Sequence, residues 1–284
     1  MENLLKNPLV INLIDISFAE DIGEGDHTSL ACIDKTEQGK SIIIAKENGV
    51  LAGIDLAEFI FKKVDPTLII KKFFSEGALL NDKDIVMEIS GSSQSMLTAE
   101  RTVLNFIQRL SGIATSTKQY AEALLDFHTQ IIDTRKTTPG MRLLEKWAVK
   151  IGGGKNHRIG LYDMILIKDN HIDFAGGIEN AIDKTHEYLK SHNLNLQIEI
   201  ETRSIEEVKK VLVKKGVHRI MLDNFTPSMI SEAVLLINHE FETEASGGIT
   251  LLTLKEYAKT GVDFISSGAL THSVKSFDFS MKAI

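Results

Sequence analysis

The chain has 284 residues, enough for about two average domains or for one α/β barrel with an added module. Hydrophobic residues make up 43% and charged residues 25% of the chain, which excludes disordered, collagen-like and coiled-coil proteins. The net charge of -7 argues against a protein that coats nucleic acid or an anionic membrane, so any anion-binding site must be local.

The chain has a single cysteine and no long apolar segment. Cys32 can form neither an intrachain disulfide nor a cysteine cluster for a metal, which fits a reducing compartment. No apolar run approaches the roughly 18 residues that span a bilayer, and the first residues lack the basic and apolar regions of a secretory signal. We therefore expect a cytoplasmic protein that binds neither membranes nor nucleic acid.

The first part of the chain mixes helical and extended patterns, which indicates an α+β layer. In chain order the patterns predict a helix over 10–18 that ends in a loop at Gly23 and Gly25, strands over 41–46, 67–74 and 84–90, a helix over 54–64, and a long helix over 96–125. The Ser111-Gly112 pair predicts a break or bend in that long helix. We expect the long helix to connect two modules.

The second part has a different rhythm, in which short apolar runs alternate with helical segments. Strands are expected at 131–133, 164–167, 196–200, 219–222, 241–245 and 262–266. This alternation predicts right-handed βαβ units and a parallel sheet, either open or closed into a barrel. Because parallel strands point their C-terminal ends the same way, residues that follow the strands should meet at one mouth. That mouth is the predicted active site.

Cationic residues follow the first two of these strands. In DTRKTTPG, Arg135 offers a fork for a carboxylate or phosphate and Lys136 a compact charge, although an exposed basic turn explains the motif equally well. GGGKNHR brings His157 and Arg158 into a glycine-rich loop, which lets backbone approach a ligand closely. Lys168 then ends an apolar strand, where a lysine has little structural reason to be. Together these segments favour an anion site.

Two carboxylates should face the same mouth from neighbouring strands. Glu201 ends LQIEIE and Asp223 ends RIMLDN, and such groups can hold sugar hydroxyls, coordinate Mg²⁺ or stabilise developing positive charge. The alternative is that each caps the following helix or pairs with Lys168. For Glu199 we favour a helix-capping or ion-pairing role, or a simple core-facing position.

The last two predicted strands are each followed by a Ser-Gly pair, in EASGGIT and ISSGALTHS. Backbone N–H groups at the start of a helix bind phosphate, and the last two loops of a barrel are where such sites recur. His128 and His218 lie near strand starts, at the opposite end from the proposed mouth, and a structural role suits them better than a catalytic one.

These motifs together resemble the quinolinate phosphoribosyltransferase family, the carboxylating nicotinate-nucleotide pyrophosphorylases. The resemblance covers nearly the whole chain, in the order AEDIGEGDHTS, AERTVLNFIQRLSGIAT, DTRKTTPGMRLLEKWAVKIGGGKNHRIGLYDMILIKDNH, IEIE, MLDN, EASGGI and ISSGALTHS. It implies an α/β fold with an N-terminal α/β sandwich over residues 1–115, which can also include the C-terminal tail, and an incomplete, TIM-like α/β barrel over residues 116–284.

The family's activity, as the resemblance implies, is transfer of the phosphoribosyl group of phosphoribosyl pyrophosphate to quinolinate with loss of CO₂. The products are nicotinate mononucleotide, pyrophosphate and CO₂, in the synthesis of NAD. The reaction uses Mg²⁺, and pyridoxal phosphate is not needed because the alkylated ring accepts the electrons left by CO₂. Relatives that act on nicotinate, or a molybdenum-transport-associated paralogue, are the alternative, and a non-catalytic nucleotide sensor is a third hypothesis.

The resemblance also assigns residues. The cations expected to bind quinolinate carboxylates and phosphate oxygens are Arg135, Lys136, His157, Arg158 and Lys168, beside Thr134. Glu201 and Asp223 match residues near the ribose and the Mg²⁺-bound pyrophosphate, with metal contact direct or through water or substrate. The 5′-phosphate cradle corresponds to Ser246, Gly247, Gly248, Ser267 and Gly268, with His272 close by. Arg101 matches an arginine that enters the neighbouring subunit's site, which implies at least a homodimer.

Overall fold

The computed structural model describes residues 2–284, with the side chain of Glu2 left out of the description. The chain divides into two compact units. One comprises the residues up to Lys118 together with Thr137–Gly153 and Leu270–Ile284, and the other comprises Gln119–Lys136 and Gly154–Ala269. The first unit therefore gathers segments from three parts of the chain, including the C-terminal tail.

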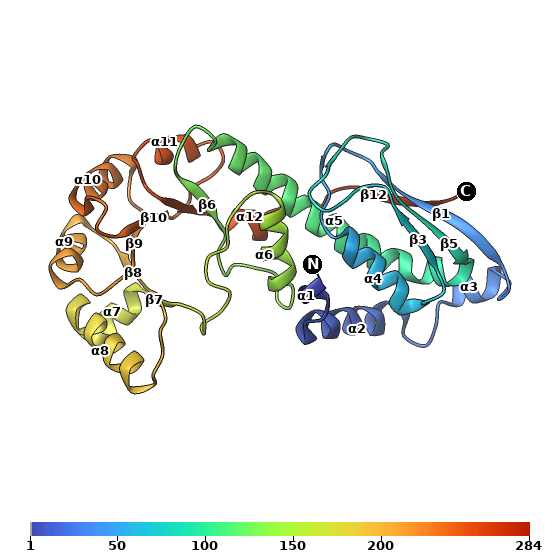
Figure 1. Cartoon of the computed structure of the whole chain (residues 1–284), viewed down its shortest axis with the longest axis horizontal. Helices are drawn as coiled ribbons and strands as arrows, with labels where there is room; N and C mark the ends of the chain where they lie inside the picture. Colours follow the sequence, from blue (N-terminus) through green and yellow to red (C-terminus); the bar gives the residue numbers. More distant parts are fainter. Residues whose placement is uncertain (1) are drawn as a thin grey trace. The chain divides into compact units, whose positions relative to one another are not determined.

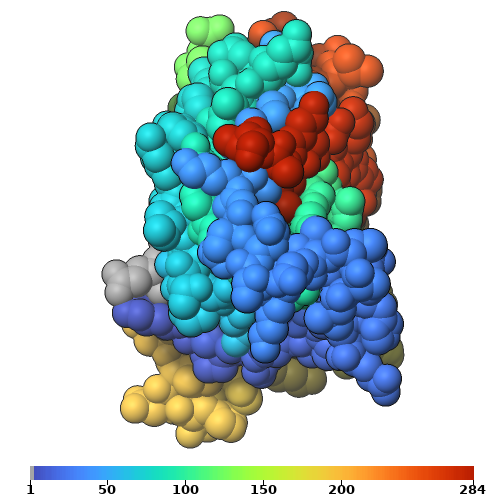
Figure 2. All heavy atoms as spheres, turned by 90° about the vertical axis from the view of Figure 1, so that its right-hand side faces the viewer, coloured from blue at the N-terminus to red at the C-terminus, as the bar shows by residue number. Residues whose placement is uncertain are grey.

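The first unit is built around a four-stranded antiparallel sheet in the order β12-β1-β5-β3. Its elements are α1 (Glu2–Leu5), α2 (Pro8–Ile22), α3 (His27–Cys32), β1 (Gln38–Ala45), β2 (Gly49–Val50), α4 (Ile54–Val64), β3 (Ile69–Lys72), β4 (Leu79–Leu80), β5 (Ile85–Ser92), the first part of α5 (Ser93–Ala123), α6 (Arg142–Ile151) and β12 (Phe279–Ala283). The C-terminal strand pairs with β1, and Figure 2 shows this tail, in red, against N-terminal residues, in blue.

Helix α4 shows why the predicted pattern folds as it does. Its residues Ile54, Ala57, Ile60 and Phe61 recur at intervals of three and four, and all are buried. The carboxylate of Glu76 caps its start, since it accepts hydrogen bonds from Gly53 N (2.8 Å) and Asp55 N (3.1 Å). The bounds of this helix match the predicted 54–64.

The predicted break in the long helix is wrong, because α5 is continuous from Ser93 to Ala123. A side chain at Gly112 would place its Cβ 2.4 Å from the carbonyl oxygen of Lys275. The glycine therefore permits the close approach of the C-terminal segment. Its neighbour Ser111 is fully buried, and its hydroxyl accepts a hydrogen bond from Ala52 N at 2.9 Å.

The second unit is a six-stranded parallel sheet in the order β6-β11-β10-β9-β8-β7, an incomplete barrel. Its elements are β6 (Gln130–Ile132), β7 (Ile165–Ile167), α7 (Asp169–Ala175), α8 (Ile178–Ser191), β8 (Ile198–Thr202), α9 (Ile205–Lys214), β9 (Arg219–Asp223), α10 (Pro227–Ile237), β10 (Glu242–Ser246), α11 (Leu254–Ala258), β11 (Phe264–Ser266) and the start of α12 (Ala269–His272). In Figure 1 helices α8 to α10 lie along one side of the strands. All six predicted strands are confirmed, and the strand-helix alternation gives the α/β fold.

Successive side chains of each strand in the parallel sheet point to opposite faces of the sheet. In β8, Ile198 and Ile200 share one face while Glu199 and Glu201 share the other, and all four are buried.

Among residues 2–284, none of the helices combines the length and apolar character needed to cross a bilayer.

Candidate active site

The C-terminal ends of the parallel strands carry most of the residues that the sequence singled out, and these belong to the second unit. Lys168 follows β7, Glu201 lies near the end of β8, and Asp223 is the last residue of β9. The remaining predicted residues of this unit stand after β6, in the segment before β7, and at the ends of β10 and β11: Thr134, Arg135, Lys136, His157, Arg158, Ser246, Gly247, Gly248, Ser267 and Gly268.

Arg135 and Arg158 are close enough for their positive charges to repel each other. Burial, reinforced by the charge of Arg135, lowers the pKa of the Arg158 guanidinium. Arg158 Nη1 donates to the carbonyl oxygen of Met164 at 3.2 Å, whereas the buried Nε of Arg135 has no hydrogen-bond partner. Two neighbouring guanidinium groups with a buried donor left over fit a ligand that carries negative charge.

A buried carboxylate that sequence reasoning missed joins the two arginine-bearing segments. Asp133 is fully buried, and its Oδ1 accepts a hydrogen bond from His157 N at 2.9 Å. Its Oδ2 accepts one from Asn156 Nδ2 at 2.6 Å. Because Asp133 lies two residues before Arg135, it ties the end of β6 to the loop that carries Arg158. The only sequence signal was its place directly after an apolar strand.

Lys168, Glu201 and Asp223 form a second group at the strand ends. Lys168 Nζ lies 3.5 Å from Glu201 Oε2. Burial raises the pKa of Glu201, the charge of Lys168 opposes that rise, and Asp223 adds to it. The predicted pairing of Glu201 with Lys168 is therefore present, and it coexists with a second carboxylate beside it. Such a site can hold hydroxyl groups and a hard cation.

The Ser-Gly segment after β10 has a backbone shape that requires glycine at one position. Gly247 has a φ of +102°, and a Cβ there would lie 2.2 Å from Asn224 Oδ1 and 2.9 Å from Asn224 N. Gly248 also has a positive φ, of +65°, but a Cβ there would meet nothing within 4 Å. The buried hydroxyl of Ser267 donates to Ile249 O at 3.3 Å, so the loops after β10 and β11 are joined.

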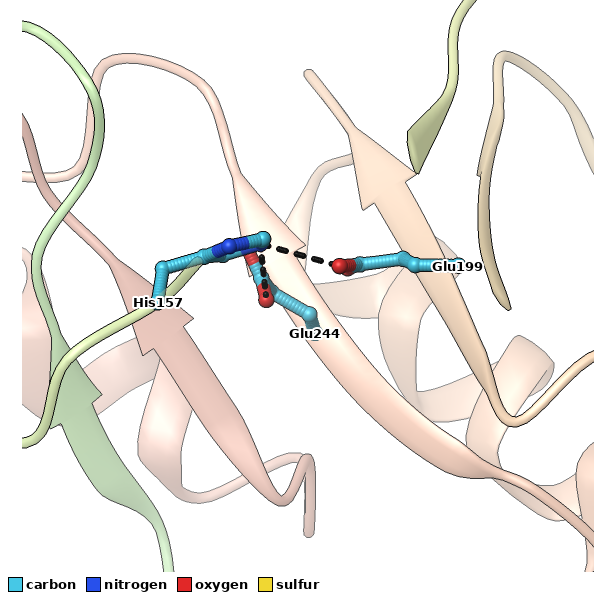
Figure 3. Close-up of side chains that lie close together, drawn as sticks. All are labelled: His157, Glu199 and Glu244. Atoms are coloured by element: carbon cyan, nitrogen blue, oxygen red, sulfur yellow. Dashed lines mark ion pairs between the residues drawn. The ribbon is translucent and has the colours of Figure 1, made fainter. Parts of the chain in front are cut away.

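A buried cluster lies on the inner face of the sheet, and sequence reasoning did not find it. His157 Nε2 lies 2.9 Å from Glu199 Oε2 and 3.5 Å from Glu244 Oε2, as Figure 3 shows. Arg219 Nη1 lies 3.1 Å from Glu244 Oε2, with its guanidinium 4.1 Å from the centre of the Phe264 ring. Glu199 is thus buried in the core, which confirms the core-facing position, and its ion-pair partner is His157. The signal that could have revealed Glu244 was charge at alternate positions of LQIEIE, RIMLD and FETEAS.

Four further residues considered in the sequence are not at the C-terminal ends of the parallel strands. Arg101, exposed on α5, and His272, exposed at the end of α12, belong to the first unit. His218 and His128 stand at the starts of strands. His218 Nδ1 accepts a hydrogen bond from Ile198 N at 2.9 Å, and His128 Nε2 lies 3.6 Å from Asp263 Oδ1. Both histidines therefore have structural partners.

Comparison with known proteins places this geometry in one family. Residues 26–111 match the model of the quinolinate phosphoribosyl transferase N-terminal domain, and residues 113–282 match that of its C-terminal domain. The chain is 48% identical over 285 residues to the chloroplastic nicotinate-nucleotide pyrophosphorylase (carboxylating) of Oryza sativa subsp. japonica, covering 95% of this chain and 76% of that protein.

Bacterial proteins give the same result. The chain is 44% identical over 269 residues to a probable nicotinate-nucleotide pyrophosphorylase (carboxylating) of Bacillus subtilis, covering 95% of this chain and 91% of that protein. The solved nicotinate-nucleotide pyrophosphorylase from Francisella tularensis superimposes with a TM-score of 0.92 at 38% identity, covering 99% of each chain. Sequence, domain order and fold agree, and the chain belongs to the quinolinate phosphoribosyltransferase family.

Proposed function

We propose that this protein transfers the phosphoribosyl group of phosphoribosyl pyrophosphate to the ring nitrogen of quinolinate and releases the 2-carboxylate as CO₂. The products are nicotinate mononucleotide, pyrophosphate and CO₂, which makes it an enzyme of NAD biosynthesis. The observation that carries this proposal is the pair Arg135 and Arg158. Their two positive charges repel each other, and the buried Nε of Arg135 has no hydrogen-bond partner, so the pair fits a dianionic ligand.

Quinolinate binding falls to the cations of the second unit. Arg135 and Arg158 suit the two adjacent carboxylates, because guanidinium groups bind carboxylates through two parallel hydrogen bonds. Lys168 and Lys136 add compact charges, which also suit phosphate oxygens. Thr134 shapes the loop, since its Oγ1 accepts a hydrogen bond from Lys136 N at 3.0 Å. A local cationic site in a chain of net charge -7 attracts two polyanionic substrates without a basic surface.

Glu201 and Asp223 are the residues that would hold Mg²⁺ and the ribose. Their donor set fits the ion, because Mg²⁺ takes one or two carboxylates and completes its shell with water and substrate phosphate. Burial raises the pKa of Glu201 and the charge of Asp223 raises it further, which supports a site where a cation would stabilise both carboxylates. When bound, Mg²⁺ offsets the charge of the departing pyrophosphate.

The loops after β10 and β11 suit the 5′-phosphate. Ser246, Gly247 and Gly248 make a tight turn beside Asn224, and Ser267 and Gly268 lie on the adjoining loop. Backbone N–H groups in turns with positive φ form concave sites for anions. The helix after Gly248 begins only at Leu254, so the support for phosphate comes from the loop itself.

The chemistry needs no nucleophile from the protein. The pyridine nitrogen forms a bond to C1 of the ribose as the bond from C1 to pyrophosphate breaks, and the protein's part is to orient both partners. Glu201 and Asp223 stabilise the positive charge that develops at C1. The alkylated ring then accepts the electron pair of the breaking C2–carboxylate bond, and a proton replaces CO₂ at C2.

A homodimer is the smallest unit in which we expect full activity, with Arg101 of one protomer reaching the site of its partner. Arg101 is exposed on α5, which supports such a role. Mixing inactive Arg101→Ala and Lys168→Ala proteins tests it, because mixed dimers contain one site with both residues intact. We expect activity to return on mixing, and a mixture as inactive as its components would contradict a shared site.

A substrate comparison tests the proposed function. Purified protein is incubated with Mg²⁺ and phosphoribosyl pyrophosphate, with either quinolinate or nicotinate as acceptor, and nicotinate mononucleotide is measured by chromatography. We expect product from quinolinate alone, and product from nicotinate instead would contradict the proposal. We place the enzyme in the cytoplasm, a proposal supported by the exposed, unpaired Cys32.

A further inference from the structure

The motif AEDIGEGDHTS, residues 19–29, lies in the first unit, and none of its residues takes part in the proposed reaction. It covers the end of α2, a short loop and the first turn of α3. Two glycines of the loop, Gly23 and Gly25, have positive φ, of +53° and +144°, and Gly25 N donates to Ile22 O at 2.9 Å. Glycine adopts such conformations without strain, so the loop is a tight turn that fixes how α2 leads into α3.

Both ends of this loop are hydrogen-bonded to α5. Thr98 Oγ1 donates to Asp26 Oδ2 at 3.3 Å, and Thr102 Oγ1 donates to Asp21 Oδ2 at 3.4 Å. Asp26 is itself held in place as the N-cap of α3, since its Oδ1 accepts a hydrogen bond from Ser29 N at 3.0 Å. These two threonine hydrogen bonds, the threonine tethers, therefore connect the loop to two successive turns of α5.

A stripe of polar residues on α5 makes these contacts. Gln94, Thr98 and Thr102 recur every fourth residue, so they lie along one face of the helix. Gln94 Nε2 extends the stripe by donating to the carbonyl oxygen of Ile33, the residue directly after α3, at 2.8 Å. The segment from the end of α2 to the end of α3 is thus hydrogen-bonded to α5 at three successive turns.

Arg101 lies on the same face of α5, because it follows Thr98 by three residues. The contacts leave it uncovered, since Arg101 is exposed whereas the next residue, Thr102, retains only 4% of its surface. Among residues 2–284, Arg101 has no hydrogen-bond or ion-pair partner. The turn of α5 between the threonine tethers therefore presents a guanidinium that can bind an anionic group outside its own chain.

The carboxylate of Asp26 is engaged by hydroxyl and backbone donors rather than by a cation. The side-chain hydrogen bond from Ser29 lowers the pKa of Asp26, together with the bonds from Ser29 N and Thr98 Oγ1. A carboxylate with three donors has little capacity left to capture a guanidinium. The tether at Thr98 thus fixes the loop and also keeps an acidic group of that loop occupied, so that Arg101 stays unpaired within its own chain.

We propose that Thr98 and Thr102 are positioning residues, which bond to Asp26 and Asp21 and thereby hold the turn of α5 that presents Arg101 to the active site of the partner subunit. What each threonine contributes is a hydroxyl donor, so serine can replace it and valine cannot. The motif AEDIGEGDHTS then supports catalysis in another chain. This inference rests on the proposed function, and in particular on the shared active site.

The kinetic test compares two double variants of the full-length protein, Thr98→Val with Thr102→Val and Thr98→Ser with Thr102→Ser. The valine variant loses both hydroxyl donors, and we expect its kcat/KM for quinolinate to fall about tenfold, as misplacement of a binding group can cause. The serine variant should stay within about twofold of the wild type, because it keeps the donors. Thr98→Val alone, at a half-buried position, should give a smaller fall.

Ser17→Ala is the matched control. Ser17 also lies in the first unit, on α2, but its hydroxyl donates within that helix, to Leu13 O at 2.8 Å. Its removal leaves the threonine tethers intact, and we expect kcat/KM to stay within about twofold of the wild type. A valine variant with the kcat/KM of the wild type, or a serine variant as impaired as the valine variant, would overturn the proposal.

Mixed dimers separate positioning of Arg101 from a general structural role. Two affinity tags isolate dimers of one valine-variant chain and one Lys168→Ala chain. The site that retains Lys168 then receives Arg101 from the chain whose threonines are intact, and we expect that site to have the kcat/KM of a wild-type site. A site as impaired as in the valine homodimer would overturn the proposal, because it would show that the threonines act within their own chain.

Mixed dimers of Arg101→Ala and Lys168→Ala chains, isolated in the same way, distinguish failure of this inference from failure of the shared site. We expect them to be active. Inactive dimers would contradict the shared site of the proposed function and overturn the inference with it. Active dimers, combined with an impaired mixed dimer of the valine variant, would overturn the inference alone.

Discussion

The adjacent glycines 247 and 248 allow a sharp test of the loop that we assign to the 5′-phosphate. Both have positive φ, so both resist substitution, but their surroundings differ. An alanine Cβ at Gly248 meets nothing within 4 Å, whereas one at Gly247 lies 2.9 Å from Asn224 N. That nitrogen cannot move freely, because it donates to Ser246 O at 2.9 Å.

The expected energies differ accordingly. Gly248→Ala adds the penalty of a left-handed conformation, about 1–2 kcal/mol in the free energy of unfolding. Gly247→Ala combines backbone strain of about 1–3 kcal/mol with a steric overlap that costs about the same again. We therefore expect a loss of about 4 kcal/mol at Gly247, at least twice the loss at Gly248.

Urea denaturation at 25 °C, followed by circular dichroism, measures both variants against the wild type. The folded fraction of the Gly247→Ala protein should also bind phosphoribosyl pyrophosphate more weakly than the wild type does, and a titration with this ligand measures the difference. Equal losses of stability at the two positions would refute the reasoning, because they would show that the contact with Asn224 does not constrain the loop.

Three further outcomes follow from other parts of the molecule. Arg109→Met should lower the free energy of unfolding by about 3–5 kcal/mol, because it leaves the fully buried carboxylate of Glu145, 2.8 Å from Arg109 Nη2, without its ion-pair partner. Urea denaturation measures this loss, and the double variant with Glu145→Gln should recover part of it. Lys168→Ala should reduce kcat/KM far more than His128→Ala, and similar losses in initial rates would contradict the position of the mouth. Burial raises the pKa of Glu201, so its carboxylate forms at a higher pH than that of an ordinary glutamate. We expect kcat/KM to fall as the pH drops through this raised pKa. A pH-rate profile measures this fall on the acid side, which should be weaker in Glu201→Gln.

The sequence predicted most of the fold because its signals were local. Helix α4 follows from apolar residues at intervals of three and four, and each parallel strand from a short apolar run between helical segments. The error at Gly112 arose because a glycine inside a helix has two meanings, a weak point or a close contact. The carbonyl of Lys275 that decides between them is distant in the sequence.

The candidate site was predictable where residues follow strands, since topology alone brings strand ends together. Lys168, Glu201 and Asp223 were found in this way. The buried supports were not, because Asp133 and Glu244 gain meaning only from the groups they face. His157 was identified as a ligand-binding residue from its motif, and only the positions of Arg158 N and Glu199 reveal how its ring is held.

The extents of the two units also depend on distant contacts. The tail from Leu270 joins the first unit because β12 pairs with β1, and no periodicity within the tail announces its partner. The segment Thr137–Gly153 belongs there as well, although it lies between strands of the second unit. The boundary at residues 115 and 116 stays a prediction, and the finer grouping came from the structure.

The most direct test of the account is the stoichiometry of the reaction with quinolinate labelled in its 2-carboxylate. Purified protein, Mg²⁺ and phosphoribosyl pyrophosphate are supplied, and labelled CO₂, pyrophosphate and nicotinate mononucleotide are measured together. The account predicts equal yields of the three products, each dependent on both substrates. Pyrophosphate released without labelled CO₂, or no product while phosphoribosyl pyrophosphate still binds, would contradict it.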